Sequence, residues 1–332
     1  EGYGDLVGAV LEVEVEERED ALEYLEENEE SSISFVNFEN LNHQHQVLLF
    51  DGKYFLDDVD GGVKYEIGIK VNSAPEFLTE VVLNNTEHLY PTAPDINDVV
   101  KINMSGVTAI SRNLAFKIEA SGNPAYPAEK IADFLGNADL VHTSNEVSFV
   151  PGCQPERSMS FCSHPNYIQT LEAINANVIE LTGNHNNDYG AIYNAQSIEM
   201  YKERDWGYYG GGLNTEDASE ALIKQVKDSK IAFLGYNYYD TIHNNHANLA
   251  GVDRAGANSF SFEKMERDIE KSKEEGAFVI VTFQFQECWS YPPSDVIYPP
   301  CYKPLANPDQ KHVFKTAIDY GADVVIGSQA HQ

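Results

Sequence analysis

The sequence has little positive charge and no long apolar segment. Lys and Arg together number 22 against 53 Asp and Glu, which gives the 332-residue chain a formal net charge of −31. Nucleic-acid phosphates and anionic membrane surfaces attract clustered cations, so this composition argues against both as partners. No apolar run approaches the roughly 20 residues that a membrane-spanning helix needs. Hydrophobic residues still make up 42% of the chain and aromatic residues 11%, which excludes disorder along its whole length.

Cysteine is also scarce, and its four copies lack the CxxC spacing of common zinc sites. They form two local pairs, Cys153 with Cys162 and Cys288 with Cys301, in segments whose Gly and Pro residues are typical of loops. Two loop-closing disulfides are predicted, with free thiols as the alternative. Because disulfides persist in oxidising compartments, an extracellular or cell-surface location is predicted. The start at Glu1, without Met or a signal peptide, fits a processed N-terminus.

The sequence predicts two regions that differ in the order of their helices and strands. Residues 1–93 are acidic and contain strand-like runs, a hairpin turn signal and one amphipathic helix, which indicates a small α+β domain of unknown role. Residues 94–98 complete a linker. Over residues 99–332 strand-like and helix-like runs alternate, as in βαβ units around a largely parallel sheet. The strands are expected near 99–105, 139–143, 177–182, 230–236, 277–283 and 322–327, and the helices near 127–136, 165–175, 191–204, 262–275 and 309–320.

Polar segments follow four of the predicted strands. In parallel sheets, ligands bind beyond the carboxyl ends of the strands, so these four segments are expected to share one site. Asn, Asp and Gly at a single strand end usually make only a turn, but four such segments with metal-binding or acid–base side chains favour a site. The segments are Ser144–Phe149, Thr182–Gly190, Gln284–Glu287 and Gly327–Gln332.

Gly183-Asn184-His185 is the most informative of these motifs. The Gly is expected to allow a sharp turn after the strand, the Asn oxygen can bind a divalent metal, and the His can transfer a proton or polarise an oxyanion. Asp188 is predicted to hold the His185 ring in one tautomer. The alternative is that Asp188 caps the helix that starts at Ala191.

With these motifs, residues 98–332 resemble the bacterial capsule-synthesis family CapA, which is associated with poly-γ-glutamate capsules and is similar to the calcineurin-like metallophosphatases. The resemblance implies an α/β fold, a four-layer α/β/β/α metallophosphatase-like sandwich, preceded here by the small α+β domain. It implies a divalent metal (Mn, Zn or Fe) as a possible cofactor. Family members continue past the position of Gln332, so the domain of residues 99–332 is expected to be incomplete at its C-terminus.

The resemblance also implies roles for the site residues. The expected catalytic residues are His185, Asp188 and Glu287. His185 would act as an acid or oxyanion stabiliser, and Glu287 would orient water. The expected metal-binding or ligand-binding residues are Asn145, Glu146, Asn184, Gln284 and His331. His185 is therefore predicted to lie near Glu146 and His331.

Departures from the family pattern indicate an eroded metal site. The first strand of family members ends in Gly-Asp, whereas residues 106–112 contain no acid. Gln284 and Ser328 stand where the family usually has His. Neutral oxygens bind divalent ions more weakly than carboxylate and imidazole do. Arg112 is expected near the former metal position, where its guanidinium would replace positive charge.

The sequence is compatible with three functions. The favoured interpretation is a cell-surface binding or structural protein of capsule, poly-γ-glutamate or polysaccharide metabolism, with an anionic polymer or a saccharide as partner. The alternatives are a metal-dependent hydrolase of phosphoester or amide bonds, and an assembly subunit that self-associates through strand edges in residues 1–93. Trp289 and Tyr291 are candidate saccharide contacts, although the loop of Cys288 and Cys301 could equally be packed by its own aromatic rings.

Overall fold

The computed structural model describes residues 99–285 and 309–328. The predicted α+β domain of residues 1–93 and the linker of residues 94–98 lie outside the described residues. So does the segment that contains Glu287, Cys288, Trp289, Tyr291 and Cys301, and so does His331.

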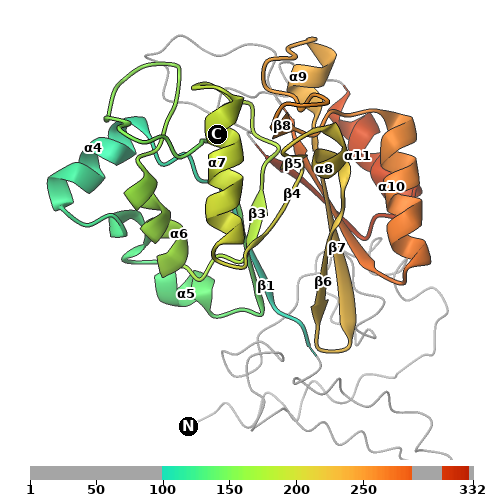
Figure 1. Ribbon diagram of the computed structural model, residues 1–332. Coiled ribbons are helices and arrows are strands. Elements are labelled where there is room, and N and C mark those ends of the chain that lie inside the picture. Colours follow the sequence, from blue (N-terminus) through green and yellow to red (C-terminus); the bar gives the residue numbers. More distant parts are fainter. Residues whose placement is uncertain (1–98, 286–308, 329–332) are drawn as a thin grey trace, which may run out of the picture. The chain divides into compact units, whose positions relative to one another are not determined.

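The first half of the described chain forms a four-stranded parallel sheet in the order β1-β2-β3-β4. Its helices lie on one face of the sheet (Figure 1). A parallel connection requires a crossover, and each crossover here contains helical turns. The strands are β1 (Ile102–Val107), β2 (Leu140–Ser144), β3 (Val178–Glu180) and β4 (Gly207–Tyr209), and the helices are α4 (Arg112–Ser121), η3 (Tyr126–Ala128), α5 (Ala132–Gly136), η4 (Pro165–Ile168), α6 (Gln169–Ala173) and α7 (Ala191–Lys202).

The second half forms another four-stranded sheet in the order β10-β9-β7-β6, in which only β6 is antiparallel to its neighbour. Two helices, α10 and α11, lie beside this sheet (Figure 1). The strands are β6 (Leu222–Val226), β7 (Ser229–Asn237), β9 (Phe278–Gln284) and β10 (Val324–Ser328), and the helices are α8 (Thr215–Ser219), α9 (Tyr238–Ile242), α10 (Phe262–Glu274) and α11 (Gln310–Asp319). A short antiparallel pair joins β5 (Gly211–Gly212) to β8 (Gly256–Ala257).

Three hydrophobic clusters explain why both sheets are buried. Successive residues of a strand point to opposite faces, so Ile179 enters the cluster with α4, α6 and α7, whereas Val178 enters a cluster shared by the two sheets. In the same way Ala232 joins the cluster with α10 and α11, and Phe233 joins the shared cluster. The expected α/β fold with parallel sheets is therefore confirmed.

The elements differ from the sequence prediction in detail. The helix expected at 127–136 is split into η3 and α5, because Ile131 between them has φ −122° and ψ −7°, outside the helical region. Helix α4 and the strands β4 and β6 were not predicted. β4 has only three residues, too few to show an alternating pattern, and β6 lies at a sheet edge with two of its five residues exposed. Within the described residues, no helix is long and apolar enough to span a membrane.

Candidate functional site at the strand ends

Loops from both sheets meet beyond the carboxyl ends of their strands. Ser144 pairs with Glu180 at the ends of β2 and β3, and Gln284 pairs with Asn237 and Ser328 at the ends of β9, β7 and β10. The Nε2 atom of Gln284 lies 3.2 Å from the Oδ1 atom of Asn184, to which it donates a hydrogen bond across the two sheets. The structure therefore brings Asn184 and Gln284 together, although 100 residues separate them.

His185 and Asp188 form a tight pair. The Nδ1 atom of His185 lies 2.6 Å from the Oδ2 atom of Asp188. The same carboxylate oxygen accepts the backbone N–H of Phe161 at 2.7 Å. The alternative role of Asp188 as a helix cap is wrong, since Gly190 occupies the N-cap of α7 and no side chain caps that helix.

The pair changes the basicity of His185. Burial of the ring acts to lower its pKa, but the hydrogen bond and charge of Asp188, with smaller contributions from Glu146 and Asp240, outweigh burial and raise the pKa above the ordinary value. The protonated imidazole therefore persists to a higher pH than in an ordinary His side chain. Such a ring can donate a proton or bind an anionic group.

Glu146 is the buried carboxyl of the site. Glu146 is only 5% exposed. Its Oε2 atom is buried and has no hydrogen-bond partner among the described residues. Burial raises the pKa of Glu146 to about 7; His185 opposes this shift, while Asp188 and Glu180 add to it. Glu146 therefore changes charge near physiological pH.

Gly183 brings the His185 loop against Glu146. A Cβ atom at position 183 would lie 2.1 Å from Cβ and 2.6 Å from Cα of Glu146. The expected turn does follow Gly183, over residues 184–189, but the φ of Gly183 is not positive. The Gly is needed instead because the backbones of two loops approach so closely that no side chain fits between them.

Amide groups complete the site. Asn145 donates to the hydroxyl of Tyr201 at 2.7 Å and to the carbonyl of Val147 at 3.2 Å, which fixes its side chain. The Oδ1 atom of Asn145 and the Oε1 atom of Gln284 are buried without hydrogen-bond partners. Together with Glu146, these groups present acceptors that a ligand with N–H or O–H donors would satisfy.

Asp240 is a residue of the site that was not predicted. It is fully buried on α9, where Asn237, Asn245 and Asn248 donate hydrogen bonds to its carboxylate. Its charge contributes to the raised pKa of His185. The signal was present in the sequence, because Asn237 directly follows the predicted strand at 230–236 and Asp240 comes three residues later.

A second buried polar group lies beneath the site. The Nε2 atom of His142 lies 3.3 Å from Oε2 of Glu180 and 2.9 Å from the hydroxyl of Tyr209. Thr282 on β9 donates to the same Tyr209 hydroxyl at 3.2 Å, and Thr182 donates to Oε1 of Glu180. This network joins the two sheets directly below the loop that contains His185.

The described residues do not fit a two-metal centre. No group of three or more His, Cys, Asp or Glu residues in residues 99–285 and 309–328 is arranged to hold a metal ion. Glu146 and His185 are accompanied by neutral amides, which are weak ligands for Mn, Zn or Fe.

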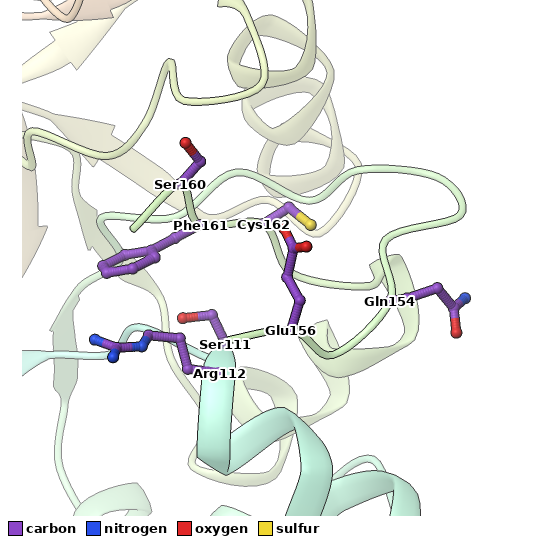
Figure 2. A pocket seen from close by; sticks show the side chains of 7 residues that line it. All are labelled: Ser111, Arg112, Gln154, Glu156, Ser160, Phe161 and Cys162. Atoms are coloured by element: carbon purple, nitrogen blue, oxygen red, sulfur yellow. The ribbon is translucent and has the colours of Figure 1, made fainter. Parts of the chain in front are cut away.

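One predicted disulfide is confirmed. Cys153 and Cys162 are bonded, with a Cα–Cα distance of 6.0 Å, and Figure 2 shows Cys162 next to Phe161. The Phe161 ring stacks on the His185 ring with centroids 4.0 Å apart. The disulfide loop thus forms one wall of the site, whereas the predicted Cys288–Cys301 bond lies in residues that the structure does not describe.

Two sequence comparisons give matches for this chain. The model of the family described as "Bacterial capsule synthesis protein PGA_cap" matches residues 101–332. The "Capsule biosynthesis protein CapA" of Bacillus anthracis is 22% identical over 262 residues, which cover 75% of this chain and 58% of that protein. The chain thus spans somewhat more than half the length of this relative. Because the family model covers well over half of the sequence and all of the strand-end motifs, the chain belongs to the bacterial capsule synthesis family.

Proposed function

We propose that this protein acts in capsule biosynthesis by binding a segment of an anionic polymer at the strand ends, through a site that has lost its metal centre. The observation that carries the proposal is the set of buried acceptors without partners, on Asn145, Glu146 and Gln284. A polymer with amide N–H or hydroxyl groups would supply the missing donors. The raised pKa of His185 supports an anionic partner, because a protonated ring attracts negative charge.

The finer fold and the location belong to this proposal. A cluster shared by the two sheets and two clusters between sheets and helices support an α/β/β/α sandwich. The Cys153–Cys162 disulfide supports an extracellular or cell-surface location, because disulfides are maintained in oxidising compartments.

A binding experiment tests the proposal. A γ-glutamyl oligomer and a neutral dextran oligomer would be titrated into the full chain by calorimetry. The γ-glutamyl oligomer is expected to bind, and His185→Ala is expected to weaken binding about tenfold or more, since charged hydrogen bonds contribute about 1.5–3 kcal/mol. His243→Ala is the matched control, because His243 is exposed at the end of α9. Binding of dextran alone, or of neither oligomer, would contradict the proposal.

A second candidate is hydrolysis of an amide or phosphoester bond, and the His185–Asp188 pair favours it. An imidazole whose second nitrogen is held by a carboxylate is suited to transfer a proton at the other nitrogen. In such a reaction His185 would protonate the leaving group, and Asp188 would stabilise the imidazolium form.

Product analysis separates catalysis from binding. If the protein is a hydrolase, incubation with the γ-glutamyl oligomer or a generic phosphodiester should yield shortened products. His185→Ala should slow that reaction at least about a hundredfold, the usual contribution of a general acid. If the protein binds the oligomer and the oligomer stays intact after prolonged incubation, hydrolysis is contradicted and only the binding function stands.

Assembly through residues 1–93 is a third candidate function. The molecular mass of the full chain in solution tests it.

A further inference from the structure

Arg112 occupies an unusual backbone position beside the site. It is the first residue of α4, and its φ of 51° lies in the left-handed region that residues other than Gly rarely adopt. Ser111 before it is extended, with φ −146°. This change of direction projects the Arg112 side chain away from the helix (Figure 2).

The Arg112 guanidinium packs on the aromatic ring that lines the His185 site. Its Cζ atom lies 5.4 Å from the centroid of Phe161, within the range of a cation–π contact. The Phe161 ring in turn stacks on His185. Figure 2 shows the guanidinium, the Phe161 ring and the Ser111 hydroxyl on the same side of a small pocket. Phe161 therefore connects this pocket to the candidate functional site.

Within residues 99–285 and 309–328, no carboxylate pairs with the Arg112 guanidinium. Glu156 also lines the pocket, but its carboxylate accepts hydrogen bonds from the hydroxyl of Tyr189 at 2.5 Å and of Ser158 at 3.1 Å. The chain has a net charge of −31, so a cation without a carboxylate partner among the described residues is unusual.

Ser111 provides an independent sign of a ligand. The residue is 6% exposed and lines the same pocket. Its hydroxyl does not cap α4, and it forms no hydrogen bond within the described part of the chain. The hydroxyl oxygen is not itself fully buried, so it stays accessible to a ligand. An anion beside Arg112 would accept a hydrogen bond from this hydroxyl and a charged one from the guanidinium.

We propose that Ser111, Arg112 and Phe161 form an anion subsite that binds a negatively charged group, a carboxylate or a phosphate, of the molecule held at His185. The subsite makes Arg112 a specificity-determining residue. The guanidinium binds the anionic group, the Ser111 hydroxyl orients it, and the Phe161 ring separates it from the imidazole. The polymer partner rests on the proposed function, but anion binding at Arg112 does not.

Small probes test the subsite without the polymer. Glutarate, inorganic phosphate and the neutral glutaramide would be titrated separately into the full chain, with the side-chain NMR signal of Arg112 and calorimetry as readouts. Glutarate or phosphate, or both, should bind and shift the Arg112 signal, whereas glutaramide should not. The stronger of the two anions identifies the source of the charge as a carboxylate or a phosphate.

Substitutions assign the binding to this pocket. Arg112→Ala should weaken anion binding about tenfold or more, because a charged hydrogen bond contributes about 1.5–3 kcal/mol. Arg112→Lys should be intermediate, since Lys keeps the charge but not the planar fork. Arg157→Ala is the matched control, because Arg157 is exposed and its Cζ atom lies 6.0 Å from the centroid of another aromatic ring, that of Phe116. Ser111→Ala should weaken binding less than Arg112→Ala and leaves the charge in place.

The outcomes separate the subsite from the proposed function. No binding of either anion to the intact protein, or equal losses in the Arg112 and Arg157 variants, would overturn the subsite. If glutarate binds at Arg112 and the γ-glutamyl oligomer does not, the subsite stands and the proposed polymer binding fails. Circular dichroism of each variant shows whether it is folded, and Arg112→Lys replaces Arg112→Ala if the latter is not.

Discussion

Glu146 combines a buried carboxyl group with a raised pKa, and this combination lowers the stability of the folded protein. The pKa of about 7 reflects mainly burial. A group whose pKa is raised on folding favours the protonated folded state. Its contribution is fully present below the unfolded pKa of about 4.5 and is lost as the pH rises through about 7.

Replacing Glu146 by Gln should therefore stabilise the protein at alkaline pH. Gln keeps the shape of the side chain but cannot ionise. The free energy of unfolding of Glu146→Gln should exceed that of the wild type by up to about 3 kcal/mol at pH 8, from 1.36 kcal/mol for each pKa unit, and should be similar at pH 4. Urea unfolding at both pH values measures the difference. Equal stability at pH 8 would show that the carboxyl is not destabilised by burial.

Gly183 is expected to be the least tolerant Gly of the site. An added methyl group would overlap the Cβ and Cα atoms of Glu146, and main-chain atoms cannot move aside cheaply. Gly183→Ala should lower the free energy of unfolding by about 1–3 kcal/mol or more, the cost of overpacking. Gly106→Ala is the control, because a Cβ atom at position 106 would meet nothing within 4 Å and Gly106 is exposed. Thermal unfolding compares the two variants, and equal effects would argue against the close contact.

At the level of elements, the loop between Cys153 and Cys162 supports the site through two contacts. The backbone N–H of Phe161 donates to Asp188, and the ring of Phe161 stacks on His185. A disulfide between residues nine positions apart holds this segment closed. The oxidation state of the loop is thereby coupled to the position of the His185–Asp188 pair.

Loss of this disulfide should affect both stability and His185. The double variant Cys153→Ser/Cys162→Ser should lose about 2–3 kcal/mol of unfolding free energy, because closing a short loop restricts the unfolded chain. The pKa of His185, followed by NMR, should change, because Phe161 would lose its stacking on the imidazole ring and its hydrogen bond to Asp188. Treatment of the wild type with dithiothreitol should reproduce both effects. An unchanged His185 titration in the double variant would show that the loop only adds stability.

For the whole molecule, the dominant physical property is its net charge of −31. Like charges repel one another in the compact state, and salt screens this repulsion over roughly 8 Å at physiological ionic strength. The melting temperature of the full chain should therefore rise between low salt and about 0.15 M NaCl, where the screening length is already short. Sucrose of equal osmolality is the control. A melting temperature that is independent of NaCl would indicate that the acidic groups do not destabilise the fold.

Features that depend on neighbours in the chain were predictable from the sequence. The alternation of strands and helices follows from local hydrophobic patterns. The Cys153–Cys162 disulfide and the contact of His185 with Asp188 join residues that are at most nine positions apart. At such separations the chain itself holds the groups within reach, so residue type and spacing are informative.

Other features depend on how distant segments pack, and only the tertiary structure decided them. The contact of Gly183 with Glu146, the stacking of Phe161 on His185 and the charge of Asp240 near the same ring depend on strand order and on the register of two sheets. Sequence spacing does not encode these distances, because burial of many apolar side chains determines the pairing of strands. The local sequence specified the chemical groups of the site, and the packing of the sheets determined which of them meet.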